Sequence, residues 1–546
     1  MLIKYLNIES RIYNIMESWS RVSSLILEKH HVKIPIEKRF FLTFVEDDDQ
    51  NIHKEKLLNY ISENGYLDDD PRLIQFRNNL KIMTKGTKIS YEEFKYCVEN
   101  HICLLKQIFR SESIIPNFRE FSRDITRIYE QTLTCTSGEN ADYIPQLARV
   151  DPEQYGVSVC TIDGQRHNIG DTTTYFSVQS CCKPINYAIA LETLGEEYVH
   201  RYVGREPSGQ AFNELLLNKR GKPHNPLINS GAIMTTSLLY PKEEMSLRFE
   251  KLMETWTKLS GGFQKIGFNN SVFLSEKSTA DRNYALAYFM QETNSNKPIG
   301  FPSDTDLHTT LELYFQSCSI EVTTEILSVV AATLANGGIN PFTGFQIFSP
   351  KTVQNALSMM LTCGMYDYSG EFAFKIGIPA KSGVAGAIMI VIPNVLGIAT
   401  WSPRLDEIGN SARGIEFCKI LGSTYNFHIF DNMSDSSKKN PLVERENGAY
   451  HQFTELCLAS QQGDLEHLKI LFNRGADFNQ SDYDGRTPLH IAVSESHLEV
   501  CRFLILIAKC NIHKKDRWNS TPYSEGIKNP ELKPLFTESE SRSGDE

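Results

Sequence analysis

Apolar residues are spaced in three different ways along the 546-residue chain. From the start to about residue 135 they recur at helical intervals between polar residues, as in Leu57-Leu58. From about 140 to 425 the composition shifts toward glycine and β-branched residues, and residues 156–162 alternate as in a strand before a turn at Asp163-Gly164. The spacing therefore predicts an all-α region over 1–135 and a mixed domain over 136–425.

The middle segment carries strand patterns at both of its ends and helical patterns between them. Two short apolar runs, near 387–392 and 395–401, are separated by Pro393-Asn394 and predict two buried strands joined by a turn. Helical spacing covers 183–203 and 323–336. We expect an α+β domain whose two ends pair in one sheet.

The last segment repeats itself with a period of 33 residues. Residues 486–492, Arg-Thr-Pro-Leu-His-Ile-Ala, align with 453–459, and Thr521-Pro522 begins a third, truncated copy. This period and the Thr-Pro-Leu-His tetrapeptide are typical of ankyrin repeats, which are interaction or packing modules.

These patterns set the remaining boundaries. We predict a linker over 426–447, ankyrin repeats over 448–530 and a disordered polar tail over 531–546. Two and a half repeats are short for a solenoid that folds alone, so we expect the ankyrin block either to pack on a sister chain or to bind another protein.

Three residues in the N-terminal region resemble the first ligands of a calcium loop. Asp47, Asp49 and Asn51 have the required spacing, but Ile52 stands where the loop needs glycine and Leu58 where it needs glutamate. We therefore expect an all-α, EF-hand-like region with a solvated acidic loop, and we predict no metal site.

Composition limits the classes of function. The formal net charge is −11, which argues against binding to nucleic acid or to a membrane surface. The 12 cysteines are scattered without a CxxC pair, as in an intracellular protein with reduced thiols. No apolar run reaches the ~18 residues of a membrane span. Residues 1–40 include Glu9, Glu17 and Glu28, so they match an acid-poor transit peptide badly.

A serine and a lysine three residues apart stand where a helical pattern begins. Ser180 and Lys183 would lie on one face of that helix, so the amine can act as the base that a serine nucleophile needs. The free N–H groups at the helix start also suit an oxyanion. S-x-x-K is a signature of serine acyl-transfer enzymes, although a capping serine followed by a solvent-facing lysine explains most such matches.

The triplet Lys381-Ser382-Gly383 strengthens the pattern. In serine acyl-transferases of the penicillin-recognising type, a K-[ST]-G triplet follows S-x-x-K in the chain and edges the site. We expect Lys381 to be a structural or electrostatic edge of the site rather than a second base. Between the two motifs, five polar residues stand in apolar surroundings, and each also has an ordinary structural explanation: Asn229, Glu276, Asn283, Tyr314 and Tyr366.

Six segments together carry a family resemblance. They are Gln179–Pro184, His224–Ile233, Ser319–Val322, Leu334–Gly338, Cys363–Asp367 and Pro379–Gly386. The chain resembles the glutaminase family, in its animal kidney and liver type, over nearly its whole length. The helical N-terminal region and the ankyrin repeats come in the same order as in that type.

The resemblance implies a β-lactamase/transpeptidase-like catalytic domain that hydrolyses L-glutamine to L-glutamate and ammonia. It implies Ser180 as the nucleophile, Lys183 as its base and Tyr366 as the residue that relays the proton. The backbone N–H groups of Ser180 and Val384 would form the oxyanion hole. Five residues would hold the substrate: Tyr143, Asn229, Glu276, Asn283 and Tyr314.

The resemblance also implies a homotetramer built from dimers, no cofactor, phosphate as a candidate activator, and a mitochondrial location, with the cytoplasm as the alternative. One loop departs from the kidney-type pattern, which has Arg at the place of Ala211 and Lys at the place of Glu214. We expect this loop to bind an anion such as phosphate less well. An insertion-like stretch over 292–299 has no functional explanation.

Two other interpretations stay open beside the amidohydrolase. One is a β-lactam-reactive or peptidase-like serine enzyme, which the set of Asn, Glu and Tyr residues disfavours because it suits a small amino acid. The other is an ankyrin interaction protein with an inactive enzyme domain, which is disfavoured because no motif position is lost.

Overall fold

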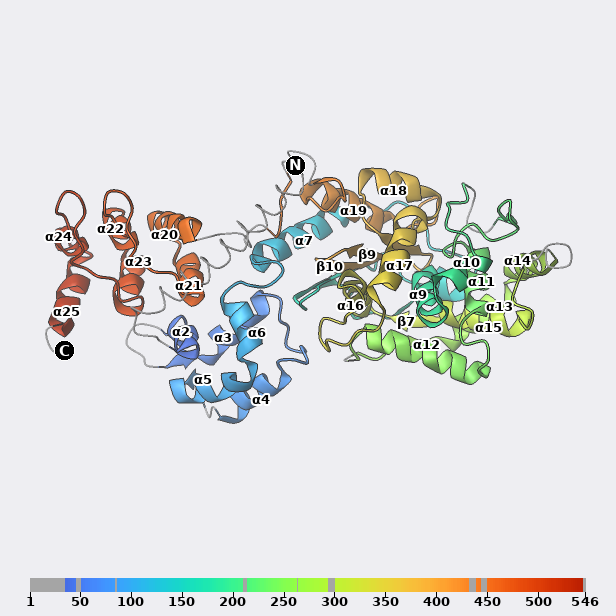
Figure 1. Ribbon diagram of the computed structural model, residues 1–546, viewed down its shortest axis with the longest axis horizontal. Helices are drawn as coiled ribbons and strands as arrows, with labels where there is room; N and C mark the ends of the chain where they lie inside the picture. The colour runs from blue at the N-terminus through green and yellow to red at the C-terminus, as the bar shows by residue number, and fades with distance from the viewer. Residues whose placement is uncertain are drawn as a thin grey trace, which may run out of the picture. The chain divides into compact units, whose positions relative to one another are not determined.

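The computed structural model describes residues 35–45, 51–83, 86–209, 214–262, 264–292, 300–431, 438–442 and 449–543. The chain forms two compact units (Figure 1). The larger unit comprises Leu58–Gln75 and Ser111–Glu446, and the smaller unit comprises Met1–Leu57, Phe76–Arg110 and Asn447–Glu546.

The larger unit is built on a five-stranded antiparallel sheet with the strand order β4-β3-β10-β9-β8. The strands are β3 (Gly156–Thr161), β4 (Arg166–Gly170), β8 (Ala380–Gly383), β9 (Ala387–Ile392) and β10 (Leu396–Trp401). β3 pairs with β10, so that Val159 lies opposite Ile398. The predicted α+β domain, with its two ends in one sheet, is confirmed.

Helices cover both faces of this sheet (Figure 1). α16 (Thr324–Ala335) lies on one face, and α7 (Phe118–Thr132) and α19 (Ala412–Thr424) lie on the other. Side chains of β9 alternate between the two cores: Met389 packs with α16, whereas Ile390 packs with α7 and α19. Because both faces are buried, the strand is apolar throughout.

The other elements of this unit are mostly helices, and β5, β6 and β7 form a second sheet in the order β5-β7-β6. Their bounds are α8 (Pro145–Ala148), β5 (Phe176–Ser177), the 3₁₀ helix η2 (Gln179–Cys182), α9 (Lys183–Leu194), α10 (Glu196–Tyr202), α11 (Asn229–Ser237), α12 (Met245–Leu259), β6 (Gly267–Phe268), α13 (Asn270–Ser278), α14 (Asp281–Glu292), α15 (Leu307–Cys318), β7 (Ile320–Val322), α17 (Pro350–Cys363), the 3₁₀ helix η4 (Tyr366–Tyr368) and α18 (Ser369–Lys375). Within the described ranges, no helix is both long and apolar enough to cross a membrane.

α7 packs in the larger unit, although it precedes the predicted boundary at residue 135. Its apolar side, which includes Phe121 and Ile125, packs in the same core as the sheet. Its Asp124 accepts a hydrogen bond from the Tyr425 hydroxyl at 2.8 Å. The sequence of α7 has the same helical spacing of apolar residues as the region before it. In the structure, these apolar residues pack against the sheet.

The described part of the predicted linker over 426–447 is also fixed to the larger unit. Lys439 forms a β-bridge with Tyr425, and its ammonium binds Glu120 and Asp124 of α7 at 2.7 Å each. Residues 438–442 therefore do not act as a free connection. Residues 432–437 and 443–447 lie outside the described ranges.

The helical N-terminal region contains two short strands that pair with each other, with Ile52 opposite Ile89. This ribbon joins two helix-loop-helix segments, as expected for an EF-hand-like fold. Its elements are α2 (Ile36–Leu42), β1 (Ile52–His53), α3 (Lys54–Glu63), α4 (Ile74–Met83), β2 (Lys88–Ile89), α5 (Tyr91–Val98), η1 (Glu99–His101) and α6 (Ile102–Phe109). Asp47 and Asp49 of the predicted acidic loop lie outside the described residues.

Three helix pairs form the C-terminal part of the smaller unit. They are α20 (Ala449–Gln462) with α21 (Leu465–Arg474), α22 (Pro488–Ser494) with α23 (Leu498–Arg502) and its π-helical extension η6 (Phe503–Ile507), and α24 (Pro522–Gly526) with α25 (Lys533–Ser543). The Thr-Pro-Leu-His tetrapeptide starts α22: the Thr487 N–H donates to His490 Nδ1 at 3.0 Å, and Thr487 Oγ1 accepts from the His490 N–H at 3.4 Å. This reciprocal cap explains why the repeat signature begins a helix.

The predicted disordered tail over 531–546 is wrong for most of its length, because α25 completes the third repeat. Leu532, Leu535 and Phe536 are buried in the ankyrin core. A Cβ atom at Gly526 would lie 2.3 Å from the Phe536 ring, so the two helices of this repeat are in close contact. These three apolar residues have helical spacing, which indicates a packed helix. The polar composition of the rest of the segment led to the prediction of disorder instead.

The ankyrin block packs against the N-terminal helices of its own chain. Asn473 Nδ2 donates to the Phe109 carbonyl at 3.1 Å, and Arg474 Nε donates to the Arg110 carbonyl at 2.7 Å. Both carbonyls belong to the end of α6, where backbone acceptors lack partners within the helix. The end of α21 thus has a partner that the sequence did not suggest.

Replacing Phe536 by alanine tests how much the third repeat contributes. We expect the free energy of unfolding of the ankyrin block to fall by roughly 3–5 kcal/mol, the usual cost of deleting a buried aromatic side chain. Hydrogen exchange over residues 449–543 measures this loss. Tyr483→Ala is the matched control, since its side chain is 98% exposed. Unchanged amide protection in Phe536→Ala would contradict the assignment of α25 to the core.

Candidate active site

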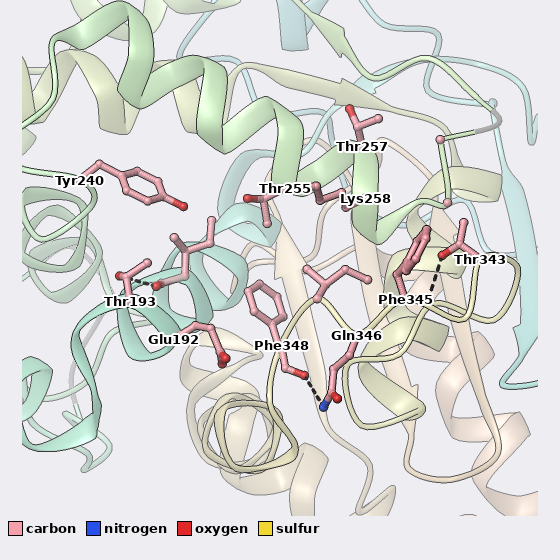
Figure 2. A pocket seen from close by; sticks show the side chains of 14 residues that line it. Glu192, Thr193, Tyr240, Thr255, Thr257, Lys258, Thr343, Phe345, Gln346 and Phe348 are labelled. Atoms are coloured by element: carbon pink, nitrogen blue, oxygen red, sulfur yellow. Dashed lines mark hydrogen bonds between the residues drawn. The ribbon is translucent and has the colours of Figure 1, made fainter.

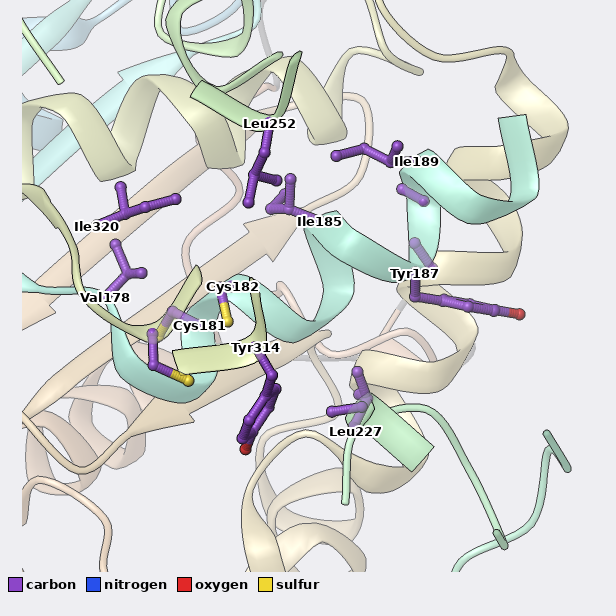
Figure 3. Close-up of a cluster of buried hydrophobic side chains, with 14 of the residues drawn as sticks. Val178, Cys181, Cys182, Ile185, Tyr187, Ile189, Leu227, Leu252, Tyr314 and Ile320 are labelled. Atoms are coloured by element: carbon purple, nitrogen blue, oxygen red, sulfur yellow. The ribbon is translucent and has the colours of Figure 1, made fainter. Parts of the chain in front are cut away.

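Ser180 lies in a tight connection between β5 and α9. Gln179 just before it adopts φ +46°, in the left-handed region that residues other than glycine rarely use. α9 is buried on all sides over its first nine residues, and Pro184 stands in its first turn, where no N–H is needed. Figure 3 shows the apolar cluster around this start, with Ile185 on α9 and Val178 before η2.

The Ser180 side chain lies near the phenol of Tyr366 and acts to lower the pKa of that group. Tyr366 follows α17 by three residues and has φ +52°, a second left-handed residue at the same place. Burial raises the pKa of Tyr366 above its ordinary value, and the nearby Ser180 side chain opposes that rise. The fold thus brings Ser180 and Tyr366 to the same buried place.

Lys183 is enclosed, with 1% of its surface exposed. Its Nζ donates to Asn229 Oδ1 at 2.7 Å. Burial lowers the pKa of Lys183 to about 8, because desolvation disfavours the ammonium form. The amine is thus close to the protonation state that a base requires at neutral pH, although the hydrogen bond it makes goes to Asn229.

Lys381 is enclosed as well and lies within β8. Its Nζ donates to the Ser382 carbonyl at 2.7 Å and lies 4.5 Å from the centre of the Tyr366 ring. Burial, followed by repulsion from Lys183, lowers the pKa of Lys381 to about 7. Two amines thus flank the serine and tyrosine pair.

Glu276 supplies a buried carboxylate to the same site. Its Oε1 accepts hydrogen bonds from the Tyr143 hydroxyl at 2.7 Å and from Gln179 Nε2 at 2.9 Å. Burial raises the pKa of Glu276, and these two hydrogen bonds oppose the rise. The Tyr143 side chain is 44% exposed, so it separates the carboxylate from solvent.

The remaining predicted residues lie around these groups. Asn229 Nδ2 donates to Asn283 Oδ1 at 3.1 Å, which joins α11 to α14. Tyr314 on α15 is 4% exposed and its ring lies near Cys182 in Figure 3. Val384 follows Gly383, where a Cβ atom would lie 2.9 Å from the Val178 carbonyl, so this part of the chain runs directly beside the segment of Ser180.

Sequence reasoning assigned no role to Gln179. Its amide holds the Glu276 carboxylate, and its left-handed backbone turns the chain into Ser180. Its position next to Ser180 could have suggested a role. Its left-handed backbone conformation, however, cannot be predicted from the residue type. Cys181 and Cys182 are fully buried. Within the described part of the chain, no three His, Cys, Asp or Glu side chains are placed to hold a metal ion.

Exchanging Glu276 for glutamine tests the electrostatics of the site. Burial raises the pKa of the folded protein's Glu276 above the unfolded value, so ionising this group destabilises the fold as pH rises. We expect Glu276→Gln to melt at a higher temperature than the parent at pH 8, and the difference to shrink as pH falls toward 4. Thermal denaturation across this range measures it, and a difference that grows toward acid pH would refute the assignment.

Models of known families match three parts of the chain. A glutaminase model matches residues 138–430, an ankyrin-repeat model residues 427–516, and an EF-hand domain model residues 36–116. The liver isoform of glutaminase from Mus musculus, described as mitochondrial, is 44% identical over 494 residues, which cover 89% of this chain and 81% of the relative. Putative glutaminase 2 of Caenorhabditis elegans is 43% identical, covering 86% of this chain and 79% of the relative.

Solved structures agree with these sequence relatives. The structure of the probable glutaminase ybaS superposes with a TM-score of 0.52 at 34% identity, covering 55% of this chain and 95% of that chain. The native form of Mglu gives a TM-score of 0.53 at 35% identity, covering 57% of this chain and 74% of that chain. The matched family model includes the enclosed serine, both lysines and the carboxylate described above, and the chain belongs to the glutaminase family.

Proposed function

We propose that this chain hydrolyses L-glutamine to L-glutamate and ammonia through an acyl-enzyme on Ser180. One observation carries the proposal: two enclosed amines of lowered pKa, those of Lys183 and Lys381, lie beside the buried Ser180 and Tyr366, and Lys381 Nζ is 4.5 Å from the centre of the Tyr366 ring. Such an arrangement supplies a nucleophile, a proton path and a base in one place.

Acylation begins when Ser180 Oγ attacks the side-chain amide carbon of glutamine. The Ser180 proton passes to the Tyr366 and Lys183 pair and then to the leaving nitrogen, which departs as ammonia. A γ-glutamyl ester remains on Ser180. Water then attacks the ester while the same groups take up and return a proton, which releases glutamate and restores the serine.

The tetrahedral intermediate places a negative charge on the former carbonyl oxygen. Backbone N–H groups of Ser180 and Val384 would stabilise that charge, and removing one such donor typically costs roughly 3–4 kcal/mol. The close approach of Gly383 to the Val178 carbonyl supports this role, because it keeps the two segments adjacent.

The substrate is a zwitterion with a side-chain amide. Glu276 suits the α-ammonium group, since it is a buried carboxylate held by Tyr143 and Gln179. Asn229, Asn283 and Tyr314 would hold the α-carboxylate by hydrogen bonds. Nitrocefin carries no ammonium group that could pair with Glu276, so its hydrolysis without ammonia release from glutamine would favour the β-lactam-reactive alternative.

The proposed assembly rests on the family resemblance of the sequence, and the proposed location also on the names of two relatives. We infer a homotetramer of two dimers and a mitochondrial location, in agreement with the mitochondrial isoforms named for Mus musculus and Rattus norvegicus. Size-exclusion chromatography with light scattering tests the assembly, and fractionation of cells expressing the full chain tests the location. No cofactor is required by the steps above.

Ser180→Ala tests the nucleophile. We expect ammonia release from L-glutamine to fall by roughly 10⁴-fold or more, as when serine nucleophiles are removed elsewhere. Ser177→Ala is the matched control, because it is a buried serine in the preceding strand. Mass spectrometry of the parent quenched during turnover should show a γ-glutamyl adduct on Ser180. Full activity in Ser180→Ala would reject the mechanism.

The pH dependence tests the base. Lys183 must be neutral to accept a proton, and its pKa is lowered to about 8. We therefore expect kcat/KM for glutamine to rise with pH and to level off above roughly pH 8. Steady-state rates between pH 6 and 10 measure this rise. A rate that is flat from pH 6 to 8 would show that no enzyme amine titrates there.

Phosphate activation tests the altered loop. Ala211 lies outside the described residues, and Glu214 is exposed. Because the loop lacks two cations of the kidney-type pattern and carries an extra anion, we expect phosphate to raise activity little. The double variant Ala211→Arg, Glu214→Lys should be activated by phosphate more than the parent. Its affinity for phosphate should rise on the order of 10-fold, which corresponds to ~1.4 kcal/mol of added anion binding. Steep activation of the parent would overturn this expectation.

A further inference from the structure

The larger unit has a hollow that shares no lining residue with the active site (Figure 2). Its volume is about 520 Å³, which lies within the ~300–1,000 Å³ of small-molecule sites. We call it the α9–α17 pocket. It is lined by the end of α9, by α12 and the turn after it, and by the loop before α17: Ile189, Glu192, Thr193, Tyr240, Thr255, Thr257, Lys258, Gly261, Gly262 and 343–348 without Gly344.

The floor of the α9–α17 pocket is apolar. Ile189 and Phe348 are only 2% and 3% exposed, whereas Phe345 on the rim is 74% exposed. The hydroxyls of Thr193 and Thr255 donate to carbonyls of their own helices, at 2.7 Å and 2.9 Å. Because these polar groups are already paired, an apolar body can enter without leaving them unsatisfied.

The two charged residues of the lining differ in their availability. The Glu192 carboxylate is engaged, since its Oε2 accepts from the Ser349 N–H and hydroxyl at 3.0 Å each. Among the residues that the structure describes, Lys258 forms an ion pair with Glu254, at 2.7 Å, and both side chains are more than half exposed. A surface pair of this kind contributes little, so the ammonium of Lys258 can meet a ligand carboxylate.

The pocket lies at the far end of α9 and against the loop that leads into α17, the two helices that precede or carry the proposed catalytic groups. α9 begins at Lys183, and α17 ends three residues before Tyr366. At the pocket, the Glu192–Ser349 hydrogen bonds join the end of α9 to the start of α17. Along their lengths the two helices pack in one core. A shift at this end would act on the two helices that position Lys183 and Tyr366.

We propose that the α9–α17 pocket binds a small apolar monocarboxylate and that this binding inhibits the enzyme. The apolar body covers Ile189, Phe348 and Phe345, and the carboxylate meets Lys258. Without ligand, Lys183 already donates to Asn229, and Tyr366 lies beside Lys381 and near Ser180. A ligand that moves the helix ends disturbs that arrangement, and a displacement of about 1 Å lowers rates by up to ~100-fold.

Binding is tested first, on the purified full chain, by calorimetry with 4-phenylbutyrate and with the uncharged 4-phenyl-1-butanol. We expect the acid to bind more tightly than the alcohol, and Lys258→Gln to remove the difference. Lys375→Gln is the matched control, since Lys375 forms a similarly exposed helical pair with Glu371. Equal affinity of acid and alcohol in the parent, or an unchanged preference in Lys258→Gln, would overturn the recognition of the carboxylate.

The apolar part is tested with two further variants. Phe345→Ala should weaken binding of both probes, whereas Phe374→Ala should not, although Phe374 is also a highly exposed phenylalanine at 81%. Thr255→Trp should fill the pocket and abolish binding. Undiminished binding in Thr255→Trp, or no binding to the parent, would show that the probe does not occupy this pocket.

Inhibition is tested by steady-state kinetics with glutamine, and this arm rests on the proposed glutaminase function. At saturating 4-phenylbutyrate we expect kcat to fall by roughly 3- to 100-fold with KM nearly unchanged, and Thr255→Trp to show the lowered kcat without ligand. Binding with unaltered kcat would refute the inhibitory role. An unliganded parent without ammonia release would refute the proposed function instead, while the calorimetric comparison would still decide the binding site.

Discussion

Two lysine side chains are taken out of water in the larger unit, and the catalytic arrangement depends on that constraint. An unpaired buried ammonium is costly, so each amine must be hydrogen-bonded and readily lose its proton. Lys183 is held by Asn229, and Lys381 by the carbonyl of Ser382 beside the Tyr366 ring. The close packing of β8 against η2 creates the enclosure, and this packing brings together two short motifs that are far apart in the sequence.

Strained backbone surrounds the same place. Gln179 and Tyr366 both have left-handed conformations, and both carry a side chain that contacts the reacting groups or the carboxylate. Such conformations typically cost about 1–3 kcal/mol each. Packing of α9 and α17 in one core holds them in place. The rigidity of the helices therefore maintains the geometry of the short turns that carry the chemistry.

Several elements could be predicted because one signal dominated them. The runs at 387–392 and 395–401 are apolar on both faces and form β9 and β10, and the Thr-Pro-Leu-His segment caps α22. The sequence did not show where α7 packs, nor that α25 is a packed helix, for a common reason: the same amphipathic spacing fits a free helix, a packed helix and a short polar segment. Which surface the stripe covers is decided by residues distant in the chain, such as Tyr425 for α7.

For the site, residue types and spacing indicated the serine, the lysines and the carboxylate, but not their partners. That Lys183 contacts Asn229 and that Gln179 holds Glu276 depend on how α11 and α13 approach η2. Hydrogen-bond partners between distant segments require the three-dimensional fold, and a single sequence contains no direct record of them.

The contact between α21 and the end of α6 has a consequence for the order in which the protein can form. The larger unit is complete once the ribosome has made residue 446, whereas the smaller unit needs residues from both ends of the chain. Its N-terminal helices must wait for Asn473 and Arg474 before the carbonyls of Phe109 and Arg110 gain these partners. During synthesis the catalytic unit therefore folds first, and the unit that begins the chain is the last to be finished.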